Sequence, residues 1–247
     1  MATNRKLYDF PIAVASGIDD YNSVVNIFGY NSAATTAFRV LWEKDSDYTP
    51  PSSAQQMQVK STSGSDTMNL LIQGLDSNYD ALEETVTLTG TSVVTTTNSF
   101  YRINNAIILS GSNVGVIDIG DDLGGSATFY AAIRAGDGKT QMSHYTVPRG
   151  YCFFLYRIDA FSADSTANKP AVFRNRLTSS TGRVLTVART TFDGNMNIQR
   201  RFPFKYDEKT DIAFQGATAS GSHEVGIFGE GLLAEQLGQT HLNNLSG

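Results

Sequence analysis

Hydrophobic and polar positions alternate along much of this chain in short stretches, which is the pattern of half-buried β-strands. In EETVTLT, residues 83–89, apolar side chains fall on one face and threonine hydroxyls on the other. Similar stretches, separated by turn residues, occupy 57–60, 68–73, 83–89, 93–97, 100–109, 114–119, 127–134, 141–147, 151–160, 171–177, 184–190, 197–204, 211–215 and 223–228. This succession predicts an all-β protein, an antiparallel β-sandwich of the jelly-roll kind with one or two β-subdomains.

The sharpest turn signal is FDGN, around Asp193 and Gly194. An Asp-Gly pair supplies the positive φ values of a type I′ turn. We therefore expect the strands on either side of it to form a hairpin.

The two ends of the chain do not follow the strand pattern. Residues 1–50 are rich in apolar side chains without a sustained period, so we expect an extended arm along the same domain or a neighbouring subunit. The leucines in residues 229–247 are spaced for two turns of helix within a short tail. A glycine-rich break separates a first β-subdomain, 51–122, from a second, 123–228, unless the two form one continuous sandwich.

Composition supports a β-protein and argues against general nucleic-acid binding. Charged residues make up 17% of the chain and the net charge is −5, which gives no basic footprint for nucleic acid. Residues 169–209 carry nine Lys and Arg against three Asp and Glu, a balance of +6, so the remainder carries −11. This cationic strip fits contacts between copies or with an acidic partner, or basic strand faces turned to solvent.

The opening residues contain no apolar run of the signal-peptide type, and no stretch is long enough to span a membrane. The single cysteine, Cys152, cannot form an intrachain disulfide or a cysteine zinc site. It lies in an apolar stretch and is expected in the core. We therefore expect a soluble protein made in a reducing cytoplasm.

No motif for nucleotide binding or catalysis is complete. AGDGKT, residues 135–140, lacks the first glycine of a phosphate-binding loop, so we expect a hairpin loop there. The three histidines are far apart in sequence, and no nucleophile elbow is present. The threonine hydroxyls have no adjacent base to activate them. We expect no enzyme activity and no cofactor.

One acidic cluster is a candidate calcium site. DIGDDLGGS places Asp118, Asp121 and Asp122 among glycines, and clustered carboxylates with flexible backbone can bind Ca²⁺. The spacing is not that of an EF-hand loop, and the bidentate Glu at its end is missing. The alternative is that these aspartates form turns.

Aromatic side chains offer another class of site. The chain has 11 Tyr and 14 Phe, several of them near expected loops, where a carbohydrate-binding sandwich would place stacking platforms. Aromatic residues are equally typical of sandwich cores and of subunit interfaces. A carbohydrate-binding module is therefore an alternative to a protein-binding one.

A series of segments carries a family resemblance. YTPPSSAQQMQVKSTSGSD, LIQGLDSNYDALEETVTLTGTSVVTTTNSFYRINNAIILSGSNVGVIDI, GKTQMSHYTVPRGYCFFLYRIDAF and FPFKYDEKTDIAF follow one another in this order. The series resembles a family of virion structural proteins of tailed bacteriophages, common in phages of aquatic bacteria, over roughly residues 20–228. SVVNIFGYNSA looks like the arm that precedes the family's core, whereas the tail after residue 228 departs from it.

The resemblance implies a β-rich, non-enzymatic virion component, present in multiple copies and assembled in the host cytoplasm. Capsid decoration (a cement or head-fibre protein) is favoured, and the alternatives are a neck or tail appendage or a carbohydrate-binding adhesin. The expected partners are other copies, with a trimer favoured, and other virion proteins such as the major capsid protein, but neither nucleic acid nor membrane. From the residues themselves, the candidate interface positions are Tyr8, Phe10, Ile12, Phe28, Tyr30, Trp42, Arg102, Arg200, Arg201, Leu232, Leu233 and Leu237.

Overall fold

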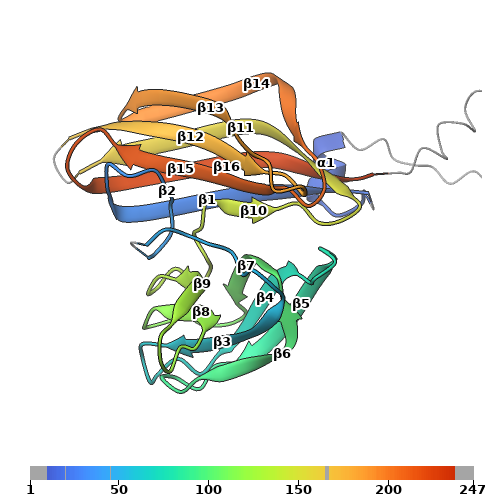
Figure 1. The fold of residues 1–247 in the computed structure, drawn as a ribbon, viewed down its shortest axis with the longest axis vertical. Helices are drawn as coiled ribbons and strands as arrows, with labels where there is room; N and C mark the ends of the chain where they lie inside the picture. The colour runs from blue at the N-terminus through green and yellow to red at the C-terminus, as the bar shows by residue number, and fades with distance from the viewer. Residues whose placement is uncertain (1–9, 20, 45, 165–166, 237–247) are drawn as a thin grey trace, which may run out of the picture.

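The structure is a computed structural model that describes residues 10–19, 21–44, 46–164 and 167–236. It consists of two β-rich lobes, one above the other in Figure 1. The larger lobe contains helix α1 and strands β1, β2 and β10–β16, and the smaller lobe contains β3–β9. The smaller lobe is therefore inserted between two strands of the larger one, and the predicted all-β antiparallel fold is confirmed.

The larger lobe is a sandwich of two antiparallel sheets. The first has the order β1-β16-β11-β14 and contains β1 (Asn22–Ala34), β16 (His223–Glu235), β11 (Tyr151–Ala163) and β14 (Asn195–Tyr206). The second has the order β10-β15-β12-β13, with β2 also pairing with β15, and contains β2 (Arg39–Val40), β10 (His144–Thr146), β12 (Pro170–Thr178), β13 (Val184–Asp193) and β15 (Asp211–Thr218). Buried rings such as Phe153, Phe173 and Phe214 fill the space between the sheets.

The smaller lobe packs two further antiparallel sheets against each other. One has the order β6-β3-β8-β9 and contains β3 (Gln55–Ser61), β6 (Val94–Phe100), β8 (Ile117–Asp121) and β9 (Thr128–Ile133). The other has the order β5-β4-β7 and contains β4 (Asn69–Leu75), β5 (Ala81–Thr87) and β7 (Arg102–Ile108). A separate core that includes Met57, Ile72 and Phe100 lies between them.

The structure corrects the expected division at residue 122. Strands β8 and β9 lie on opposite sides of that boundary, yet they pair with each other and share one core. The expected arm is also largely a strand, because β1 pairs with β16 along almost its whole length. Apolar residues lie on both faces of this strand, some toward the core and some outward. The sequence therefore shows no simple alternation of apolar and polar positions there.

The expected helical turns in the C-terminal tail are also corrected. Residues up to Glu235 continue β16, which pairs with β1 on one side and β11 on the other. The two flanking strands satisfy the backbone of this segment on both sides, whereas two isolated turns of helix are not stable alone. Gly231 fits this packing, because a Cβ there would lie 2.3 Å from the ring of Phe153.

The hairpin expected at Asp193 and Gly194 is corrected. Gly194 has the expected positive φ of 70°, but Asp193 does not have one, so the chain bends here without a type I′ turn. Strand β13 pairs with β12 in one sheet, whereas β14 pairs with β11 in the other. The bend therefore carries the chain from one sheet of the sandwich to the other, at the open edge of both.

Candidate functional site

The outward side of the sheet β1-β16-β11-β14 carries rows of apolar side chains, and a polar row of Asn26, Glu230 and Arg157 crosses between them. The register places Val24 opposite Leu232 and Leu232 opposite Phe154, and further along it places Phe28 opposite Phe228. The residues next to these in each strand belong to the buried core, so these side chains face outward. The apolar face, as we call it, comprises Val24, Phe28, Tyr30, Phe154, Phe161, Phe228 and Leu232.

Helix α1 (Phe10–Ala15) lies against one end of the apolar face. Phe10 and Val14 line a depression of about 290 Å³ together with Val24 and Leu232. Phe10 and Ile12 nevertheless remain 53% and 55% exposed. Accessible apolar surface that extends over several elements marks an interaction site.

At the other end of the apolar face, two aromatic rings lie side by side. The centroids of Tyr30 and Phe161 are 6.1 Å apart, with an interplanar angle of 28°. Gly226 stands between them in the register, and a Cβ there would lie 2.1 Å from the Phe161 ring. The Tyr30 hydroxyl donates to Glu224. A depression of about 430 Å³, lined partly by Phe161, opens beside these rings.

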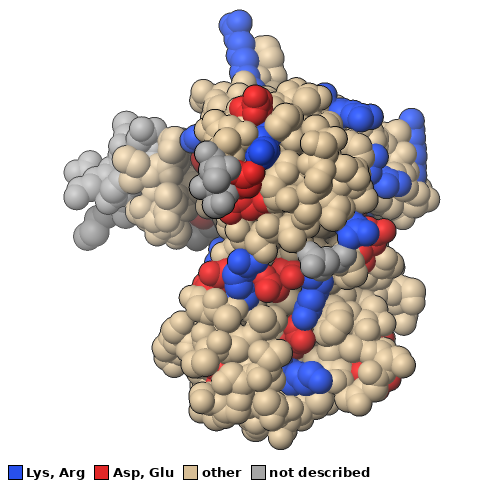
Figure 2. Space-filling model, turned by 90° about the vertical axis from the view of Figure 1, so that its left-hand side faces the viewer, with Lys and Arg blue, Asp and Glu red and all other residues tan. Residues whose placement is uncertain are grey.

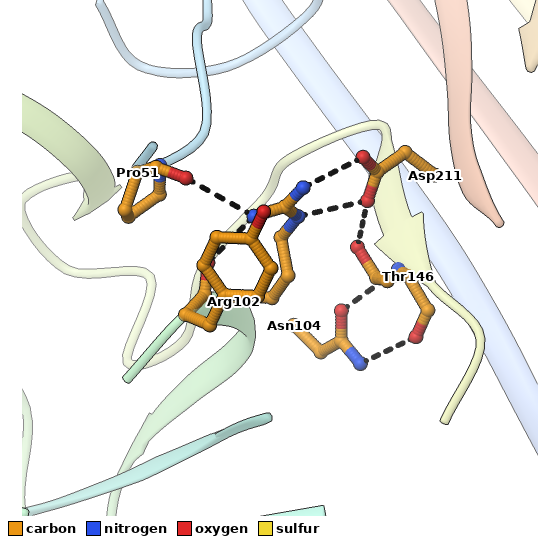
Figure 3. A network of polar contacts seen from close by, with 6 residues as sticks. Pro51, Arg102, Asn104, Thr146 and Asp211 are labelled. Atoms are coloured by element: carbon orange, nitrogen blue, oxygen red, sulfur yellow. Dashed lines mark hydrogen bonds and ion pairs between the residues drawn. The ribbon is translucent and has the colours of Figure 1, made fainter. Parts of the chain in front are cut away.

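A buried ion pair joins the two lobes (Figure 3). Arg102 of β7 is only 5% exposed, and its Nε and Nη2 donate to the Asp211 carboxylate of β15 at 2.9 and 3.0 Å. Its Nη1 donates to the carbonyls of Pro51 and Tyr101, and the Thr146 hydroxyl donates to Asp211 at 2.5 Å. Arg102 was expected at an interface between subunits, and the structure places it at the interface between lobes.

The electrostatics of this pair favour the charged forms. Burial alone would raise the pKa of Asp211, but hydrogen bonds and charge from Arg102 hold that pKa below its usual value. Burial acts against the charge on Arg102, but Asp211 raises the pKa of the guanidinium above its usual value. Both groups therefore stay ionised at neutral pH.

Further ion pairs surround the joint between the lobes. The N–O distances are 2.6 Å for Arg149–Asp80, 2.8 Å for Arg134–Glu43 and 2.7 Å for Lys44–Asp118. Figure 2 shows Lys, Arg, Asp and Glu side chains gathered at the junction between the two lobes. Charged contacts therefore fix the smaller lobe against the larger one at several points.

An amide side chain completes the pairing of β10 next to this joint. Asn104 of β7 donates through Nδ2 to the Thr146 carbonyl and accepts from the Thr146 N–H, both at 2.9 Å. These are the two hydrogen bonds that a neighbouring strand would supply. The edge of β10 is thereby closed by the smaller lobe.

A cleft of about 510 Å³ lies between the lobes beside Asn104. One wall is the stretch from Ser23 to Phe28 in β1. The facing wall includes Gln73, Glu83 and Asn105 from the sheet β5-β4-β7. Its lining combines amide side chains with a larger number of apolar residues and has few charges.

His144 lies near the joint in a position where it stays uncharged. Burial lowers the pKa of His144 to about 4, although the charge of Asp211 acts in the opposite direction. Its ring centroid lies 4.6 Å from that of Tyr48. Its Nδ1 is buried and has no hydrogen-bond partner among the described residues.

We predict that acid destabilises the protein through His144. Unfolded His144 binds a proton below its ordinary pKa of 6.5, but folded His144 does so only near 4. Stability should therefore fall as the pH drops from about 6.5 to 4, by a total of about 3 kcal/mol. Denaturant unfolding across this window should show a shallower pH dependence in His144→Phe, which keeps a ring against Tyr48. An equal slope in both proteins would contradict the assignment.

The cationic strip forms a cluster on the outward side of the second sheet. Arg174 of β12 stands directly opposite Arg189 of β13, and their guanidinium carbons lie 4.2 and 5.0 Å from the centroid of Phe38. Burial and the charges of Arg176 and Arg189 lower the pKa of Arg174. Figure 2 shows Lys and Arg side chains concentrated on one side of the larger lobe.

The three candidate calcium ligands have separate roles. Asp118 pairs with Lys44, and Asp121 accepts from the Tyr130 hydroxyl at 3.0 Å. Asp122 has a positive φ of 43° and accepts from the Ser126 N–H, as a turn residue does. The structure therefore does not bring the three carboxylates to one site.

The other predicted interface residues are distributed unevenly. Trp42 is 2% exposed and Leu233 is buried against the core, so neither belongs to an open surface. Arg200 is half-buried and Arg201 is exposed, both on the edge strand β14. Tyr8 and Leu237 lie outside the described residues.

Sequence reasoning missed the partner strands of the apolar face. Phe154 and Phe228 were assigned to strands but not to an interface, and Phe161 lies one residue beyond the expected strand 151–160. The strand β11 reads YCFFLYRIDAFSA, in which both faces carry apolar residues over much of its length. Apolar residues on both faces of a strand are the signal that its outer face is also covered or bound.

The described ranges contain neither a metal-binding cluster nor a membrane-spanning helix. No group of three or more His, Cys, Asp or Glu side chains there is placed to hold a metal ion. None of the helical segments in those ranges is long and apolar enough to cross a membrane. Cys152 is buried, and burial raises the pKa of its thiol.

Comparison with known proteins assigns the chain to no family. No family model matches it, and no curated protein matches it. A structure of the Gt strain of infectious bursal disease virus aligns with 8% identity and a TM-score of 0.20, covering 87% of this chain and 73% of the other. A mutant VP2 protein of the same virus, from T=1 particles, gives 8% identity and a TM-score of 0.17, covering 95% and 81%. Neither similarity extends beyond a shared richness in β-structure.

Proposed function

We propose that this chain is a structural protein of a tailed-bacteriophage particle that acts through protein–protein contacts. Decoration of the capsid exterior, as a cement or head-fibre protein, is the favoured role, and a neck or tail appendage is the alternative location. The ordered series of family-like segments supports this proposal. The structural observation that carries it is the apolar face with helix α1 beside it.

The chemistry of the apolar face suits a protein partner. Interface cores are enriched in aromatic side chains and poor in charge, and a few buried aromatic anchors supply most of the binding energy. Phe28 and Phe228 lie opposite each other in the middle of this face. Both are half-buried in the isolated chain, so their rings are held in place and still accessible.

We expect the double variant Phe28→Thr/Phe228→Thr to weaken self-association at least tenfold, or about 1.4 kcal/mol. Threonine keeps the strand propensity of both positions while removing the rings. Sedimentation velocity over a concentration series measures the change.

The matched control is Val184→Thr/Phe202→Thr, which removes exposed apolar side chains from β13 and β14. The control should associate like the parent protein. Equal behaviour of the two double variants would show that the apolar face is not the contact between copies.

A carbohydrate-binding adhesin is the second candidate, and one observation favours it. The stacked rings of Tyr30 and Phe161 lie beside a depression that is also lined by Asp159, Asn195 and Asn197. An aromatic platform next to hydrogen-bonding side chains suits a sugar ring. Binding on a glycan array that is lost in Phe161→Ala would support the adhesin, and no binding at millimolar sugar would remove it.

A further inference from the structure

The cleft between the lobes has an open strand edge as one wall. Within the described residues, β1 pairs with β16 alone, so its other edge has no strand partner. Six consecutive residues, from Ser23 to Phe28, line the cleft. Figure 1 shows β1 on the side of the larger lobe that faces the smaller lobe. An open edge of this kind is a template for an added strand.

The opposite wall presents a row of hydrogen-bonded polar side chains. The row crosses strands β5, β4 and β7 and ends at Thr140, which lies outside this sheet. The Thr140 hydroxyl donates to Asn105 at 2.9 Å, and the Asn105 amide donates to Gln73 at 3.0 Å. The Gln73 amide donates in turn to Glu83 at 2.6 Å. The amides in this row hold both donors and acceptors, which are the groups that the outer edge of an added strand requires.

Elsewhere in the same molecule, an amide side chain already hydrogen-bonds to the backbone of an edge strand. Asn104, next to Asn105 in β7, forms both backbone-type hydrogen bonds to Thr146 and so closes the edge of β10. The edges of β10 and β1 lie on the same side of the larger lobe (Figure 1). One edge is closed by the smaller lobe, and the other is left with a cleft beside it.

The cleft favours an uncharged occupant. Among the residues that the structure describes, only Lys139 and Glu83 bring charged side chains to the lining of the cleft, and their formal charges cancel. We propose that the cleft binds an extended, uncharged peptide segment as an added strand on β1, and that residues 237–247 of a second copy supply this segment.

Sequence and length favour this segment. LGQTHLNNLSG contains no Lys, Arg, Asp or Glu. The six-residue wall of β1 is about 20 Å long at the usual rise of a strand. The eleven residues from 237 to 247 are enough to follow it and leave several for the connection.

The last described residues lie between β1 and β11. The backbone N–H of Gln236 donates to Gly150 at 2.7 Å, and its side chain donates to Tyr151 of β11 at 3.1 Å. The backbone N–H of Glu235 donates to Tyr21 at 2.9 Å, beside the start of β1. The inference rests on the proposed function only in requiring that copies meet.

Cross-linking between copies of the full chain tests the source of the segment. Isotopically heavy and light copies are mixed, each carrying a photo-cross-linking residue in place of Asn26, which lines the cleft. Mass spectrometry should find cross-links from position 26 to residues 237–247 of the other isotopic form. The same residue at Asn197 on β14 is the control and should give none. Cross-links only within one copy, or none to this segment, would overturn the proposal.

Peptide binding tests the cleft without relying on assembly. A fluorescent peptide of residues 237–247 should bind the dilute full chain saturably in anisotropy measurements. Binding should weaken at least tenfold in Gln73→Ala/Asn105→Ala and stay unchanged in Gln56→Ala/Gln199→Ala, whose side chains are exposed elsewhere. Equal binding of a scrambled peptide, or equal binding by both variants, would overturn the assignment. If the peptide did not bind but the particles still assembled, the cleft proposal would be wrong and the proposed function would be unaffected.

Discussion

Replacing Asp211 with alanine is expected to lower the free energy of unfolding by about 3–5 kcal/mol. The substitution leaves the Arg102 guanidinium buried with no carboxylate to balance its charge, and it removes the acceptor of the Thr146 hydroxyl. Denaturant unfolding followed by circular dichroism measures the loss. The pair joins β7 of the smaller lobe to β15 of the larger lobe. Its loss should therefore also weaken the contact between the two lobes.

The exposed pair between Arg149 and Asp80 provides the control. Their side chains are about half exposed, so Asp80→Ala should cost no more than about 1 kcal/mol. The double variant Arg102→Leu/Asp211→Leu should recover much of the loss, because it removes both buried charges. If Asp211→Ala cost no more than Asp80→Ala, the buried pair would not be what holds the lobes together.

The variant Trp42→Ala is expected to cost about 3–5 kcal/mol of stability. The indole is almost fully buried with Val40 and Met142, and it meets the Tyr48 ring edge-on at 5.5 Å. Its Nε1 donates to the Ser46 carbonyl at 3.0 Å. The loss therefore comes from an emptied core position and a broken hydrogen bond, and equilibrium unfolding measures it.

The variant Phe202→Ala is the comparison for Trp42→Ala. Phe202 is 78% exposed, so its loss should change stability by less than about 0.5 kcal/mol. A stable Trp42→Ala protein that no longer self-associates would contradict the buried assignment and restore Trp42 as an interface residue.

The strand content could be predicted from the sequence because alternation is a local property. Residues 83–89 were expected as a strand, and the structure places β5 at Ala81–Thr87. The positive φ of Gly194 was also predicted, but the type I′ hairpin around it was not confirmed. Which strands pair is a longer-range property. The sequence around Gly194 could not show that β13 and β14 belong to different sheets.

The site could be predicted only in part, for the same reason. Phe28, Tyr30 and Leu232 were expected at an interface, and the structure places them half-buried on the outward side of the first sheet. Trp42 was also expected at an interface, as an apolar residue of the N-terminal arm, yet a local loop buries it. The pair of Arg102 and Asp211 joins residues 109 positions apart, and nothing local in the sequence links them.

The most direct test of the proposal that this chain belongs to a phage particle is quantitative mass spectrometry of purified phage particles. A structural protein that acts by contacts between copies should be found in every particle preparation, in a fixed ratio to the major capsid protein. A ratio of many copies per particle would indicate capsid decoration, and a small fixed number would indicate a neck or tail component. Absence of the chain from purified particles would contradict the proposed function.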